Sequence, residues 1–307
     1  MVGMTRKKTL FWLCIFLLPN LLGFLIFIAI PILGSLGISF TDWDLVSTIH
    51  FTGFENYKRL FNDPEFWKSF RNTITFIIGY LPSVMILGLA CALMLNQKIK
   101  LRPFFRAVYF LPVITSWVAV SLVWKWLFNP SYGLINYFLS LIGIAGPNWL
   151  TDPQTAMIAV IITSAWKDIG FVMVLFLGGL QNISPSYYEA ANMDGASKLR
   201  QLFSITIPLL TPTTFFVTII SLINSFQVFD QVMIMTEGGP SGATMTLVQN
   251  IYNHAFRYFE MGYASAMSWI LFIVIFIITI IQNKLQKRLV QLLMKTEKKW
   301  FTKMATI

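Results

Sequence analysis

Six stretches of this sequence are long and apolar enough to cross a lipid bilayer, which takes about 20 residues for a helix. Only 12% of the 307 residues are charged, about half the ~25% typical of a soluble domain, so the remaining charge lies between the stretches. In lipid, backbone polar groups need internal partners, so the stretches are predicted to be helices. The predicted fold is an all-α integral membrane protein in one domain, residues 1–307. The expected spans lie near residues 10–40, 73–95, 104–128, 155–180, 209–233 and 261–282.

The distribution of charge predicts which ends of these spans face the cytoplasm. Cytoplasmic connections of membrane proteins carry an excess of Lys and Arg. With the N-terminus inside, the inner segments hold most of the 23 Lys and Arg residues, and the outer segments hold most of the 13 Asp and Glu residues. Both termini are therefore predicted to be cytoplasmic, with a basic tail at residues 283–307. The net charge of +10 follows from topology and contact with anionic lipid, so it does not indicate nucleic-acid binding.

Residues that catalyse reactions or bind metals are scarce. The chain has two histidines, His50 and His254, and two cysteines, Cys14 and Cys91, and none of them has the spacing of a metal site. The phosphate-binding pattern G-x-x-x-x-G-K-[ST] is absent. We therefore predict no catalytic residue, no metal site and no bound cofactor, and a membrane enzyme is the weakest alternative function.

A polar segment, YYEAANMDGASKLRQLFSITIPLL, stands between two apolar stretches at residues 187–210. Ser184 followed by a proline is typical of a helix N-terminus. Gly195 permits a sharp turn, and a second helix is expected to continue to Pro208, where the next span begins. Residues 184–208, named here the signature segment, are thus predicted to form a helix–turn–helix on the cytoplasmic side. It is either an ordinary interfacial connector or a docking element for a partner.

The signature segment closely resembles the signature loop of permease subunits from binding-protein-dependent ABC importers. The shared pattern is E-A-A-x-x-D-G-A-x-x-x-x-x-x-F-x-I-x-I-P. The matching residues are Glu189, Ala190, Ala191, Asp194, Gly195, Ala196, Phe203, Ile205, Ile207 and Pro208. The resemblance covers roughly residues 16–285. Stretches that resemble the sugar-importing branch, and the first permease subunit of its maltose or glycerol-phosphate type, are SFTDW (39–43), NYKRLF (56–61), FLP (110–112), WLFNPSYGLIN (126–136), FLGGLQ (176–181) and TEGGPSGAT (236–244).

The resemblance implies a type I ABC importer permease fold with six transmembrane helices and a cytoplasmic coupling helix. It also implies a bacterial or archaeal cell membrane, a second permease subunit (a homologous, different chain), two ATPase subunits that bind ATP and Mg²⁺, and an external solute-binding protein. In the family this segment docks into a cleft on the ATPase. The residues to which it assigns ATPase coupling are Glu189, Ala190, Ala191, Asp194, Gly195, Ala196 and Pro208.

Span five carries polar residues at helical spacing. Ser221, Asn224, Gln227 and Gln231 recur every three or four positions, so they are expected to share one helical face. Polar residues at bilayer depth either join helices or line a pathway, and both alternatives are open here. Sugar hydroxyls need groups that both donate and accept hydrogen bonds, as amides do. These residues are therefore candidates for the substrate pathway.

Span four places two charges near the middle of the membrane, in the sequence Trp166-Lys167-Asp168. Neighbouring helix positions point in different directions, so the two charges are not expected to pair with each other. Trp166 and Asp168 join the candidate pathway residues, because intramembrane charges are often functional. A structural ion pair with another span is the alternative.

The TEGGPSGAT segment (236–244), named here the glycine-proline loop, is expected outside the membrane between spans five and six. Gly238, Gly239 and Pro240 mark a tight turn. The family resemblance implies contact with a solute-binding protein at these residues. A plain surface turn is the alternative.

The predicted function is that of a permease subunit of an ATP-driven importer of sugar, most simply an oligosaccharide, that forms half of an alternating-access pathway. The alternatives are a permease for glycerol phosphate or another small polyol, an ATP-independent secondary carrier, and a scaffold that only recruits an ATPase. A phosphorylated substrate needs cations near its site, and span five has none. The sequence leaves open which carbohydrate is carried, and whether this chain or its partner contacts it.

Overall fold

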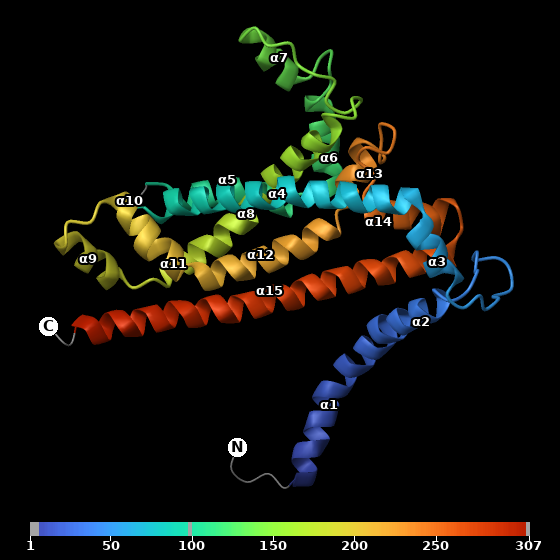
Figure 1. The fold of residues 1–307 in the computed structure, drawn as a ribbon, viewed down its shortest axis with the longest axis horizontal. Coiled ribbons are helices and arrows are strands. Elements are labelled where there is room, and N and C mark those ends of the chain that lie inside the picture. The colour runs from blue at the N-terminus through green and yellow to red at the C-terminus, as the bar shows by residue number, and fades with distance from the viewer. Residues whose placement is uncertain (1–5, 98–99, 305–307) are drawn as a thin grey trace. The chain divides into compact units, whose positions relative to one another are not determined.

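The computed structural model describes residues 6–97 and 100–304, and these form helices joined by turns, with a single isolated bridge between Thr41 and Phe51 (Figure 1). Lys98 and residues 305–307 of the predicted basic tail lie outside the described residues. The chain divides into two compact units. The first contains the chain up to Asp63 together with Ile251–Phe272, and the second contains Pro64–Asn250 and the chain from Ile273 onward. A single domain stays a prediction.

The first unit begins with one apolar helix, Phe11–Ile38, which is long enough to cross a membrane and has a mean hydropathy of 2.7. Near its middle the helix widens into a π-helical turn, η1, just before Pro31. Proline lacks an N–H and its ring crowds the carbonyl four residues earlier, so a wider turn relieves the clash. The elements of this unit are α1 (Arg6–Phe24), η1 (Leu25–Ala29), α2 (Ile30–Ile38), α3 (Glu55–Asn62), η3 (Asn253–Arg257) and the start of α15 (Met261–Met304).

A charged cluster ties α3 to the turn that precedes α15. Arg59 forms an ion pair with Glu260, with Nη1 and Oε1 2.9 Å apart, and its guanidinium lies 4.1 Å from the ring centroid of Tyr263. Burial raises the pKa of the Glu260 carboxyl, but the hydrogen bonds from Arg59 and His254 outweigh it, so the net pKa lies below its usual value. The Tyr263 hydroxyl donates a hydrogen bond to Asp63, at 2.6 Å. The cluster thus joins segments that are far apart in the sequence.

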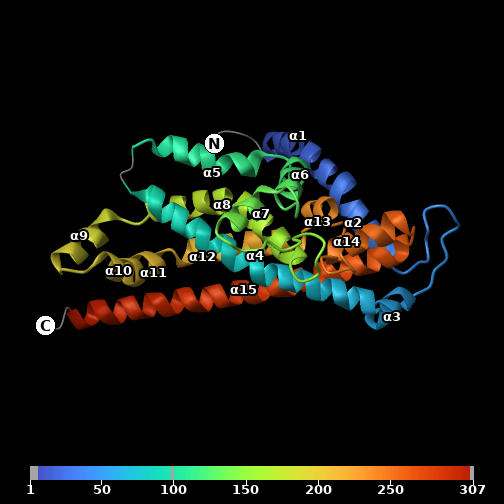
Figure 2. The same ribbon diagram turned by 90° about the horizontal axis from the view of Figure 1, so that it is seen from above.

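The second unit is a helical bundle around α4 and α8, which lie side by side, with α5 and α12 packed against them (Figures 1 and 2). Its apolar core includes Phe76, Val84, Val172 and Phe176, all almost fully buried. The elements are α4 (Pro64–Asn96), α5 (Arg102–Ile114), α6 (Trp117–Leu127), α7 (Leu134–Leu141), α8 (Ala156–Gln181), α9 (Pro185–Met193), α10 (Lys198–Gln201), η2 (Leu202–Thr206), α11 (Ile207–Leu209), α12 (Thr211–Phe226), α13 (Asp230–Met235) and α14 (Leu247–Tyr252), which continues into the first unit.

Two of the expected spans are broken helices. The described chain has four helices that are each long and apolar enough to cross a membrane, or six candidates if two bent pairs count as one span each. The expected span 104–128 is α5 and α6, bent by 97°, because the Ser116 hydroxyl caps a new helix by accepting from the Val118 N–H. The expected span 209–233 breaks twice. α12 meets the preceding helices at 65°, and it ends at Phe226, before α13 begins.

Gly170 marks a close approach of α8 to α5. A Cβ added at Gly170 would overlap the carbonyl oxygen of Tyr109, whereas a Cβ at Gly178, eight residues along the same helix, would meet nothing within 4 Å. Overpacking a buried contact costs about 1–3 kcal/mol, and Ala in an open helix position is about 1 kcal/mol better than Gly. We expect Gly170→Ala to lower the thermal unfolding temperature in detergent and the matched Gly178→Ala to keep or raise it. Equal unfolding temperatures for the two variants would contradict this packing.

Candidate functional site

The signature segment lies at one end of the second unit's bundle, and α13 lies at the other, with α12 running between them (Figures 1 and 2). Helix α9 starts where the sequence predicts. The Ser184 hydroxyl is the N-cap and accepts a hydrogen bond from the Ser186 N–H, at 3.4 Å, and Pro185 follows in the first turn. The predicted N-cap is therefore confirmed, and the helix ends at Met193.

Gly195 closes α9 in a left-handed conformation, with φ of +71°. The Gly195 N–H donates to the Asn192 carbonyl at 3.1 Å, and the Ala196 N–H donates to the Ala191 carbonyl at 2.9 Å. This pair of hydrogen bonds is a Schellman motif, in which glycine is favoured because a Cβ strains the left-handed backbone. The turn predicted at Gly195 is therefore present, and its left-handed backbone favours glycine.

Helix α9 has no buried residue. Glu189, Ala190, Asp194 and Gly195 are exposed, while Ala191, Ala196 and Pro208 are half-buried. The large apolar residues of the signature segment that remain exposed are Tyr187 (50%), Met193 (89%), Leu199 (69%), Phe203 (65%) and Ile207 (39%). Such a concentration of exposed apolar side chains beside charged ones is typical of a surface that contacts another protein.

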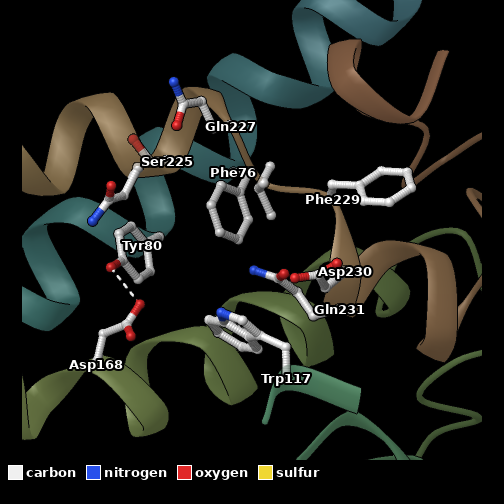
Figure 3. Close-up of a pocket in the computed structure, with 11 residues that line it drawn as sticks. Phe76, Tyr80, Trp117, Asp168, Ser225, Gln227, Phe229, Asp230 and Gln231 are labelled. Carbon is white, nitrogen blue, oxygen red and sulfur yellow. Dashed lines mark hydrogen bonds between the residues drawn. The ribbon is translucent and has the colours of Figure 1, made fainter. Parts of the chain in front are cut away.

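A cavity of about 280 Å³ lies in the second unit, where α12 ends and α13 begins (Figure 3). Four of the predicted pathway residues line it: Asp168, Asn224, Gln227 and Gln231. The other two predicted residues do not line it. Ser221 is buried within α12, and the ring of Trp166 packs on that of Trp124, with centroids 5.5 Å apart. The lining residues that the predicted pathway set does not include are Phe76, Tyr80, Trp117, Ser225, Val228, Phe229 and Asp230.

The cavity lining combines aromatic rings with amide, hydroxyl and carboxyl groups. The rings of Phe76 and Tyr80 stack with centroids 5.2 Å apart. The Tyr80 hydroxyl donates a hydrogen bond to Asp168 Oδ2 at 2.8 Å (Figure 3), and the Gln231 amide donates to the Ser164 hydroxyl at 3.1 Å. None of the lining residues is Lys, Arg or His. This set can bind a hydroxylated molecule through hydrogen bonds and flat contacts.

The two charges of span four have separate partners, as their adjacent helix positions predict. Asp168 accepts from Tyr80, whereas the Lys167 ammonium donates to the carbonyl of Val113 at 3.0 Å and lies 4.6 Å from the ring centroid of Trp117. Both partners belong to other helices, but neither is an ion. The alternative of an ion pair with another span is therefore wrong for the described residues.

The polar residues of span five do not share one continuous helical face, contrary to the sequence prediction. Helix α12 ends at Phe226, the chain is non-helical until Phe229, and α13 begins at Asp230. Asn224 precedes the break, Gln227 lies in it, and Gln231 follows it. All three line the cavity, but they come from three successive segments of the broken span and not from one helical face. Asp230 is exposed at the start of α13, which brings a second carboxyl group to the lining.

The glycine-proline loop is fixed against α4. The Lys68 ammonium donates to the Ser241 carbonyl at 2.6 Å, and the Asn72 amide donates to the carbonyls of Gly242 and Met245 at 2.8 and 2.9 Å. The predicted docking residues are only partly accessible: Gly238 is buried, and Gly239 and Pro240 are half-buried. The exposed positions beside them are Glu237 and Ser241.

Residues 84–291 match the family model described as binding-protein-dependent transport system inner membrane component. The chain belongs to this family. It is 36% identical to the trehalose/maltose transport system permease protein MalF of Thermococcus litoralis, over 87% of this chain and 91% of that protein. It is 36% identical to the multiple sugar-binding transport system permease protein MsmF of Streptococcus mutans, over 93% of this chain and 99% of that one.

A solved structure of a bacterial ABC transporter involved in the import of the acidic polysaccharide alginate has the same fold. A chain of it superimposes with a TM-score of 0.81 at 26% identity, covering 92% of this chain and 96% of that chain. A second structure of an alginate transporter, in complex with an alginate pentasaccharide-bound periplasmic protein, gives a TM-score of 0.80. The fold class of this ABC importer permease, predicted from the sequence, is confirmed.

Proposed function

We propose that this permease forms half of the pathway of an ATP-driven carbohydrate importer, with both termini in the cytoplasm. The observation that carries the proposal is the cavity, whose aromatic rings and amide and carboxyl groups suit sugar hydroxyls. Relatives named for sugar transport support the same substrate class. ATP and Mg²⁺ bind to two partner ATPase subunits, and a second permease subunit and a solute-binding protein outside the membrane complete the importer.

The proposed coupling site is the signature segment, with α9 docked on an ATPase subunit. Glu189 orients the docking, Ala190 and Ala191 allow a close approach, and Gly195 sets the turn. Closure of the two ATPases on ATP would draw their docked helices together. The spans then switch between inward-open and outward-open arrangements, because ATP binding favours only one of the two. The exposed side chains of α9 support this assignment.

The proposed substrate is an uncharged saccharide. Asp168 and Asp230 are the ionisable acids of the cavity lining, and none of the lining residues is a cation. A phosphate or uronate group would meet carboxylates without a compensating positive charge, so the glycerol-phosphate alternative is disfavoured at this cavity. Carboxylates accept hydrogen bonds from neutral sugar hydroxyls. An ATP-independent carrier remains the alternative of a different class, and it would transport in liposomes without ATPase subunits, where this chain should be inactive.

Gly195→Arg tests the coupling site. The substitution forces an L side chain into the left-handed turn and adds a bulky cation beside α9, so we expect normal membrane abundance with uptake at least about tenfold lower. Asn tolerates the left-handed region better than other residues, so the matched Gly195→Asn variant should retain most uptake. Uptake by the Arg variant equal to wild type, at equal abundance, would refute docking through this turn.

The cavity is tested by replacing Asn224 and Gln227 together with Leu. Loss of both amides removes hydrogen-bonding groups from the lining, so substrate-stimulated ATP hydrolysis and uptake of neutral oligosaccharides should both fall, at unchanged assembly. Ser221→Ala serves as the control, because Ser221 is polar and close in sequence but lies outside the lining. Unchanged stimulation and uptake in the double variant would remove these residues from the pathway.

A further inference from the structure

Helix α9 is attached to α10 and η2, the helical segment that leads into span five, by buried polar contacts as well as by the chain itself. We infer that Gln201 and Thr206 form a lock that makes α9 move as one body with α10 and η2, which continue through α11 into α12. This inference rests on the proposed coupling function of the signature segment. It concerns how movement of α9 is passed on, which docking alone does not explain.

Two side-chain contacts form the lock, one near each end of α9. The Gln201 amide donates to Asn192 Oδ1 at 2.7 Å and to the Ala196 carbonyl at 2.9 Å. The Tyr188 and Thr206 hydroxyls lie 2.9 Å apart in a hydrogen bond. Gln201 is 3% exposed and Thr206 is 5% exposed, so water competes little for these bonds. Tyr188 and Asn192 are four residues apart and therefore share one face of α9.

The π-helical turn η2 explains how Gln201 and Thr206, which precede span five, reach that face together. Gln201 and Thr206 are five residues apart, which in a regular α-helix would place them on different sides. In η2 the Ile207 N–H donates to the Leu202 carbonyl, five residues back, and this wider turn brings positions five apart toward the same side. The Thr206 hydroxyl also donates to the Gln201 carbonyl at 3.4 Å. Pro208 follows η2, and its ring disfavours a regular turn over Ser204.

Without the lock, little would fix the direction of α9. The helix has no buried residue to anchor it through apolar packing. It is bounded by a non-helical connection before Ser184 and by the Gly195 turn, so it could pivot at both ends. A displacement of α9 by a docked partner would then only change the orientation of α9 and would not displace α12. The lock therefore makes Gln201, Thr206, Tyr188 and Asn192 positioning residues for coupling.

The inference is tested by measuring the distance between two spin labels in the assembled importer by double electron–electron resonance spectroscopy. Spin labels are placed at Met193→Cys on α9 and Phe216→Cys on α12, both exposed positions, after Cys14 and Cys91 are replaced by Ser. We expect one narrow distance distribution, unchanged by ATP. The lock is broken by Gln201→Leu or by Tyr188→Phe, which removes only a hydroxyl. Each should broaden the distribution, and uptake should fall at least about threefold while ATP hydrolysis continues.

Ser204→Ala is the control, because it removes an exposed hydroxyl from η2, two residues from Thr206 and outside α9, and should change neither readout. Exchanging the amides, Asn192→Gln with Gln201→Asn, should restore a narrower distribution than Gln201→Leu. Narrow distributions and full uptake in both Gln201→Leu and Tyr188→Phe would overturn the lock. The two proposals fail in different ways. Normal uptake by the Gly195→Arg variant would refute docking through the signature segment. Lock variants that still co-purify with the ATPase and keep narrow distance distributions would refute the lock alone.

Discussion

The need to satisfy backbone carbonyls away from water governs this structure, because its cavity sits where spans are broken. The break between α5 and α6 frees carbonyls at the end of α5, and the Lys167 ammonium binds one of them, that of Val113. The break after α12 frees the Val228 carbonyl, which accepts from the Thr246 hydroxyl at 3.0 Å. Irregular backbone at membrane depth is tolerated where protein groups or a cavity satisfy it. The helix breaks are therefore stable only because polar side chains nearby satisfy the freed carbonyls, and those side chains find their partners only because the helices break.

This dependence gives Lys167 a structural role that its sequence position does not reveal. A charge in the middle of a span is a functional candidate by default. Here the Lys167 ammonium donates a hydrogen bond to the Val113 carbonyl and lies over the Trp117 ring. The second contact helps to fix that ring at the cavity. Asp168, one residue further on, lines the cavity itself. Adjacent charges thus divide into one that supports the site and one that belongs to it.

Local sequence signals predicted those parts of the fold that depend on interactions between residues close together in the sequence. Apolar length indicated where the spans lie, Ser184 indicated where α9 begins, and Gly195 indicated its turn. The break at Gln227–Phe229 has no such signal, because no Gly or Pro marks it. It depends on contacts with other segments, such as that of Thr246 with Val228. For this reason the sequence singled out Asn224, Gln227 and Gln231, which line the cavity, but it placed them on a continuous helical face that the structure does not contain.

The aromatic part of the cavity could not be predicted for a different reason. In a soluble protein, a large aromatic residue is usually buried in the core, but a membrane span also exposes such residues to lipid. Phe76 and Tyr80 face the cavity, whereas Phe104 and Phe216, equally apolar in sequence, are exposed. Only packing separates the two groups. Tyr80 is distinguished by its hydroxyl, which needs a partner in an apolar setting and finds Asp168.

The two ends of α12 carry different kinds of site, and one helix of 16 residues joins them. At ~1.5 Å per residue it is about 24 Å long, so a rigid α12 carries a displacement at the η2 end to the cavity end. Its core contacts with α4 and α8 involve Val217, which is fully buried, and these resist bending. The chain then breaks at Gln227, where the cavity begins. Movement of α12 would therefore shift Asn224 and Gln227 relative to Tyr80 and Asp168 on the neighbouring helices. A cavity lined from several helices changes shape when one of them moves, which is what alternating access requires.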